Sequence, residues 1–128
     1  MLNRELMISL ENKLHGFHTR TKELHFSASS YSLHSVIDEF DESLLKFEDE
    51  VMENMQALFE VIKPGELNPE LPGALDFKTL LEDLRGVLVN IKKELDNGMM
   101  YTGIINIIDD FFANVNKYIY LVNIINKE

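Results

Sequence analysis

Apolar residues recur along this chain at steps of three and four, the spacing that lines one face of an amphipathic helix. Four such stretches predict helices over about Leu2–His25, Leu33–Ile62, Phe77–Asn97 and Thr102–Asn126. The fourth stretch is rich in β-branched residues, which favour strands, but its length without a turn signal favours a helix. Its apolar face is broader than one helix seam needs. We therefore expect this helix either to contact other subunits or to lie centrally in a compact monomer.

Proline and glycine divide the chain into two halves. All three prolines and two of the six glycines fall in the segment KPGELNPELPG, residues 63–73. We expect Ser30 or Ser32 to cap the second helix, Asp76 to cap the third, and Gly98 to follow the third helix. The pattern predicts an all-α four-helix bundle, made of two helical hairpins joined by a Pro/Gly-rich connector, as a single domain over residues 1–128.

Composition restricts the chemistry that the chain can perform. It has no cysteine, which excludes disulfides and thiolate chemistry. A bound metal would depend on His, Asp and Glu, which suit iron, manganese or zinc. The 22 acidic and 12 basic residues give a net charge of −10. This balance argues against DNA binding by the folded body and favours a surface that attracts cations.

The sequence shows no membrane or export signal. No apolar run reaches the roughly 18 residues of a transmembrane helix. The N-terminal segment MLNRELMISLENKL carries charges every few residues and lacks the apolar core of a signal peptide. We therefore expect a cytoplasmic protein without membrane contact.

The candidate chemistry centres on the segment HFSASSYSLHSVID, in which two of the four histidines flank a short polar loop. At about 100° per residue, four polar residues of the second helix share one flank. They are His34, Asp38, Asp49 and Glu53. On the first helix, His18 and His25 also share a flank. Neither flank faces the centre of the bundle, so the remaining ligands are expected from a neighbouring copy across a two-fold axis. His25, His34 and Asp38 of one subunit would then meet Asp49 and Glu53 of the next.

Two other interpretations stay open at this point. Asp41 and Glu48 fall inside the apolar arc of the second helix, where they would serve a di-metal site within one chain. The third and fourth helices contain no histidine and no Glu-x-x-His motif, which such sites usually use. Alternatively, the acids are solvated and the chain is a non-catalytic structural or assembly protein with the same fold.

The segment TKELHFSASSYSLHSVIDEFDESLLKFEDEVMENM resembles the signature of the Dps mini-ferritins, the DNA-binding proteins from starved cells. In that family a His-Trp pair ends the first helix, and His25-Phe26 is similar to it. A His-x3-Asp step follows, matched by His34 and Asp38, and then an Asp-x3-Glu step, matched by Asp49 and Glu53. The segment NVNKYIYLVNII also resembles the family's last helix.

The resemblance implies a ferritin-like four-helix bundle that assembles into a hollow dodecamer built from two-fold dimers. It implies a ferroxidase that oxidises Fe(II) with peroxide or oxygen and stores the ferric product. Its iron ligands at the inter-subunit sites would be His25, His34, Asp38, Asp49 and Glu53, with zinc or manganese as substitutes for iron. The loop after His25 is shorter than in the family, which makes His18 a substitute candidate. The chain has no basic N-terminal tail, so DNA binding is not expected.

Overall fold

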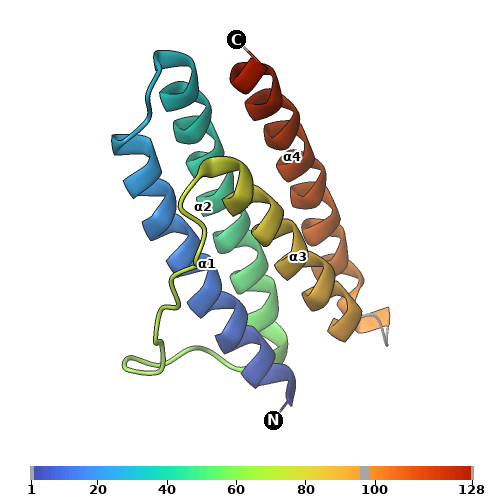
Figure 1. Ribbon diagram of the computed structural model, residues 1–128. Coiled ribbons are helices and arrows are strands. Elements are labelled where there is room, and N and C mark those ends of the chain that lie inside the picture. Colours follow the sequence, from blue (N-terminus) through green and yellow to red (C-terminus); the bar gives the residue numbers. More distant parts are fainter. Residues whose placement is uncertain (1, 96–98, 128) are drawn as a thin grey trace.

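Four long helices account for most of residues 2–95 and 99–127, the parts of the chain that the computed structural model describes (Figure 1). They are α1 (Leu2–Phe26), α2 (Tyr31–Phe59), α3 (Phe77–Leu95) and α4 (Thr102–Lys127), with a short 3₁₀ turn, η1 (Met99–Tyr101), before α4. These two described ranges contain no strand. The predicted all-α class is confirmed.

Side-chain caps explain where two of the helices begin. The hydroxyl of Ser30 accepts a hydrogen bond from the backbone N–H of Leu33 at 3.1 Å, so α2 starts at Tyr31, two residues before the predicted start. Asp76 caps α3, because its Oδ1 accepts from the backbone N–H of Thr79 at 2.9 Å. The caps expected at Ser30 and Asp76 are confirmed.

The end of α2 differs from the prediction. The helix ends at Phe59 rather than Ile62, because Glu60 adopts a positive φ of 74° that breaks the helical path. The backbone N–H of Ile62 instead donates to the side-chain oxygen of Gln56 at 2.9 Å. The predicted end of α3 at Asn97 and the glycine at Gly98 lie outside the described residues.

The helices form two antiparallel hairpins, α1–α2 and α3–α4. In the bundle α2 packs against α4, and α1 packs against α3. Figure 1 shows the connector running back along the bundle from the end of α2, so that α3 points in the same direction as α2. A bundle with one long crossover is the topology of ferritin-like folds. The predicted two hairpins joined by a Pro/Gly-rich connector are confirmed.

Aromatic side chains form the seam between α2 and α4. The ring of Phe40 is fully buried, with ring centroids 5.4 Å from Phe77, 6.5 Å from Phe111 and 5.5 Å from Tyr118. Phe47 stacks on Phe111 at 4.1 Å. The broad apolar face of α4 is only partly covered within one chain, because Ile124 remains 39 % exposed.

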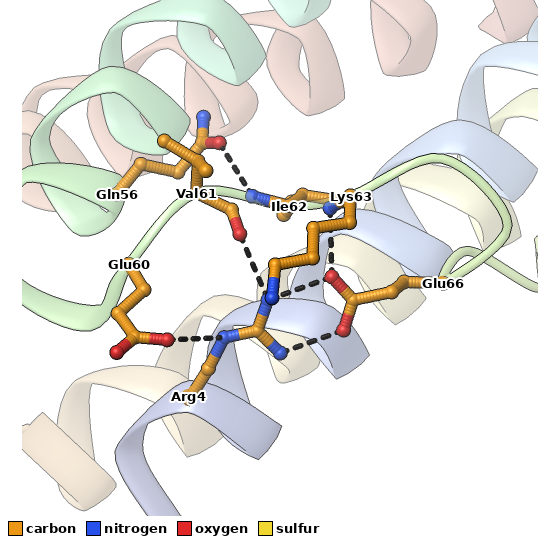
Figure 2. Close-up of polar contacts among 7 residues, drawn as sticks. All are labelled: Arg4, Gln56, Glu60, Val61, Ile62, Lys63 and Glu66. Atoms are coloured by element: carbon orange, nitrogen blue, oxygen red, sulfur yellow. Dashed lines mark hydrogen bonds and ion pairs between the residues drawn. The ribbon is translucent and has the colours of Figure 1, made fainter.

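The start of the connector is fastened to α1 by Arg4 (Figure 2). The two terminal nitrogens of Arg4 donate to the two carboxylate oxygens of Glu66 at 2.7 Å each, and one also donates to the carbonyl oxygen of Val61 at 2.8 Å. The backbone N–H of Lys63 donates to the same carboxylate at 2.7 Å. These bonds lower the pKa of Glu66 to about 2, first through Arg4 and then through the Lys63 N–H. The carboxylate therefore stays charged down to strongly acidic pH.

The middle of the connector lies directly against α1 at Gly16. The backbone N–H of Glu70 donates to the carbonyl oxygen of Asn12 at 3.0 Å, and the N–H of Asn68 donates to the Asn12 side chain at 2.8 Å. A Cβ atom on Gly16 would lie 1.7 Å from the carbonyl oxygen of Glu70. Glycine is therefore required here for the two backbones to approach.

Candidate functional site

The turn between α1 and α2 brings two histidines into contact. The rings of His25 and His34 lie with their centroids 3.9 Å apart and their planes inclined by 35°. Nδ1 of His34 lies 3.3 Å from the carbonyl oxygen of His25. When this nitrogen carries the proton it donates to that carbonyl, and the Nε2 lone pair of the exposed His34 ring is left available to a metal.

Asp38 lies next to this histidine pair. It follows His34 by one helical turn, so both side chains are on the same face of α2. Asp38 is exposed, and together with His25 and Asp41 it lines a small cavity of about 140 Å³. Nδ1 of His25 is buried and has no hydrogen-bond partner among the described residues. The structure thus places His25, His34 and Asp38 at one end of the hairpin, although the three do not form a metal-binding group within one chain.

Asp49 and Glu53 lie elsewhere on α2. Both are exposed, and Asp49 is about 16 Å from Asp38 along the helix at 1.5 Å per residue. Within the ranges 2–95 and 99–127, no three His, Asp or Glu side chains of one chain are placed to hold a metal ion together. The five predicted ligands therefore fall into two separate groups on one molecule.

Asp41, one of the two alternative ligands, is paired with a histidine. Nδ1 of His18 lies 2.7 Å from Oδ1 of Asp41, with the two side chains 25 % and 20 % exposed. His18 is therefore engaged with Asp41 and not with the His25–His34 pair. Asp41 and Glu48 are also two helical turns apart, about 10 Å along α2. One di-metal centre would need further carboxylates between them.

The core offers one buried carboxyl group among the described residues, that of Glu11, and it lies beside Glu48. In the described parts of the chain, the buried polar side chains are Glu11 and Thr21, both on α1. Thr21 is satisfied, because its hydroxyl donates to the carbonyl oxygen of Phe17 at 2.7 Å. The buried positions of α3 and α4 are apolar apart from the ring of Tyr118.

Glu11 is the residue that the sequence-based prediction missed. Its side chain is only 8 % exposed, and its Oε1 accepts no hydrogen bond from any described residue. Its carboxyl group faces Glu48. Burial raises the pKa of Glu11 to about 8, helped by a hydrogen bond with Glu48 and by the negative charges of Glu48 and Asp49. A helical wheel contains the signal, since Met7 and Leu14 flank Glu11 at steps of four and three on the buried face.

Comparison of the chain with family models, with curated proteins and with solved structures finds no match. Over their described residues, the helices also lack any segment long and apolar enough to cross a membrane. The functional argument therefore rests on the geometry of the α1–α2 hairpin.

Proposed function

We propose that two copies of this chain bind Fe(II) between them and oxidise it, as a mini-ferritin of the Dps type. One observation carries the proposal: His25, His34 and Asp38 gather at one end of the hairpin, whereas Asp49 and Glu53 are exposed farther along the same helix. A two-fold axis between these groups would place the histidine end of each copy against the carboxylate end of the other. Such an isologous contact forms two equivalent sites.

The ligand set determines the chemistry. Two imidazoles and three carboxylates are ligands that suit Fe(II), with zinc and manganese as competitors. Fe(II) is the substrate, and two Fe(II) ions each give up one electron. The two electrons cleave the O–O bond of peroxide and yield two hydroxide ions and two Fe(III) ions. The net charge of −10 attracts the incoming cation.

Assembly into a hollow shell extends the same proposal. Tyr120 and Ile124 of α4 are 63 % and 39 % exposed. They leave an apolar surface on α4 for contacts between copies. Oligomers of this kind are built from symmetric contacts. We infer a dodecamer of two-fold dimers that stores the ferric product in its cavity, in the cytoplasm.

The first experiment is an anaerobic Fe(II) titration of the purified protein, followed by peroxide. Absorbance follows the ferric product and light scattering follows particle size. We expect saturable binding, rapid oxidation and a large particle. The double variant Asp49→Asn/Glu53→Gln should lose both activities. The matched control Glu39→Gln/Glu50→Gln removes two exposed carboxylates on another face of α2 and should keep them.

Mixing two inactive variants tests whether the site is shared. One variant lacks the histidines (His25→Ala/His34→Ala), and the other lacks Asp49 and Glu53. A mixed dimer contains one complete site, so mixing should restore part of the activity. If both variants are inactive and mixing restores nothing, while mixed particles form, the ligands do not come from two subunits. Absence of Fe(II) binding by the unmodified protein would instead leave a structural four-helix protein.

A further inference from the structure

A second acidic pocket lies between α1, the middle of α2 and the connector. It has a volume of about 280 Å³, and four carboxylates line it: Glu11, Glu48, Asp49 and Glu53. No lysine, arginine or histidine is among its lining residues. Gln56 also lines the pocket, but its amide is occupied, because it donates to the carbonyl oxygen of Met52 and accepts from the N–H of Ile62. No basic side chain of the pocket therefore neutralises these acids, and Glu11, whose pKa burial and Glu48 raise to about 8, carries a proton at neutral pH until a cation binds.

Glu11 makes this pocket different from an ordinary acidic surface. Its side chain is 8 % exposed, and its Oε1 is buried without a hydrogen-bond donor among the described residues. A buried carboxylate oxygen without a donor is costly unless a bound group satisfies it. A donor with positive charge would satisfy Glu11 and Glu48 together.

The other wall of the pocket is apolar. Met52, Ile62 and Leu67 form it, and Leu67 comes from the connector, 37 % exposed. No three of the acids are placed to hold one metal ion in the parts of the chain that the structure describes. A compact divalent ion would also leave the apolar wall unused. A carboxylate group opposite an apolar wall is complementary to an ammonium group on a methylene chain.

The geometry points to a binding site for a linear aliphatic amine, such as a diamine or polyamine. One ammonium group donates to Glu11 and Glu48, and the methylene chain lies along Met52, Ile62 and Leu67. This ligand is separate from the proposed Fe(II) chemistry. Asp49 and Glu53 are shared with the proposed inter-subunit site, so the tests below use Glu11 and Leu67, which are not among its ligands.

The test is calorimetric titration of the full chain with 1,5-diaminopentane at neutral pH, where both amines are protonated. We expect one saturable site per chain. Glu11→Gln should weaken binding about tenfold or more, because an amide cannot lose a proton to become a charged acceptor at the buried end. The control Glu39→Gln removes the same charge from an exposed position of α2 and should change binding less than about twofold. Equal weakening by both variants would mean nonspecific attraction to an acidic protein and would overturn the proposal.

Two further measurements distinguish a pocket that binds an aliphatic amine from one that binds a metal ion. Ethylamine should bind more weakly than the diamine, and Leu67→Ser should reduce this difference while the carboxylates remain. In the His25→Ala/His34→Ala variant, which lacks the histidines of the proposed inter-subunit metal site, Mn(II) should not displace the diamine at equal concentration. Displacement by Mn(II), or an equal affinity for the two amines, would assign the pocket to a small cation instead. Neither result affects the Fe(II) experiment, in which the histidine variants decide.

Discussion

The substitution Gly16→Ala tests whether the connector is docked on α1 as described. The added Cβ would lie 1.7 Å from the carbonyl oxygen of Glu70, whereas real Cβ contacts are essentially never shorter than 3.0 Å. The two backbones would have to separate by about 1.3 Å, the difference of these values. The added Cβ is fixed to the backbone of residue 16 and the carbonyl oxygen belongs to the backbone of Glu70, so no side-chain rotation relieves the contact. The connector must move.

The energetic cost follows from what the movement breaks. The backbone hydrogen bond from Glu70 to Asn12 is worth about 1 kcal/mol. Overpacking strain adds roughly 1–3 kcal/mol. The higher helix propensity of alanine stabilises the folded state by about 1 kcal/mol and offsets part of this cost. We therefore expect Gly16→Ala to lower the free energy of unfolding by about 1–3 kcal/mol.

Gly86 provides the matched control within the same molecule. It is an exposed residue inside α3, and a Cβ there would meet no atom within 4 Å. Gly86→Ala should therefore raise the free energy of unfolding by about 0.5–1 kcal/mol. The measurement is urea unfolding followed by far-UV circular dichroism. If both substitutions stabilise the protein, the connector does not lie against α1 at Gly16.

Three other predictions concern single polar residues. The pKa of Glu11 is raised from 4.5 to about 8; its contribution to stability is full below pH 4.5 and is lost as pH rises to 8. One pKa unit corresponds to about 1.4 kcal/mol, and water in the open pocket reduces the energetic effect of the shift. Glu11→Gln should therefore stabilise the protein by about 2–4 kcal/mol at pH 8 and much less at pH 4, as measured by urea unfolding. The pKa of Glu66 is lowered to about 2, so its stabilisation is full above pH 4.5 and is lost as pH falls to 2; Glu66→Gln should lower the melting temperature at pH 7 and leave it nearly unchanged at pH 2. Asp76→Ala should cost about 1 kcal/mol by removing the cap of α3, and Asp76→Asn should restore most of it in the same unfolding assay.

Local patterns account for the parts of the fold that the sequence predicted. Ser30 and Asp76 cap helices through bonds to residues three positions away, so the sequence itself contains both partners. The apolar stripes also predicted the buried face of each helix, because helical periodicity is a local property. The three-residue error at the end of α2 arose at Glu60, where a positive φ ends the helix despite continuing apolar residues.

The partners of the buried acid depend on contacts between distant parts of the chain. A helical wheel places Glu11 on a buried face, but it does not show that Glu48 lies opposite. The same holds for His18, which lies 2.7 Å from Asp41 across the α1–α2 interface. Both pairs depend on how far α1 is shifted along α2, and the sequence of either helix alone does not define that shift.

The connector defines how far α1 is shifted along α2. Arg4 and Gly16 fasten α1 to the connector at two points, and the connector follows directly from the end of α2. A shift of α1 by one residue would move its side chains by about 1.5 Å along the axis and turn them by about 100°. Such a shift would separate His25 from His34 and would turn Glu11 out of its pocket. The salt bridge at Arg4 and the close approach at Gly16 are not part of the His25–His34 turn, yet they hold the same helix in register. The geometry of both candidate sites therefore depends on the Pro/Gly-rich connector as well as on the residues that line them.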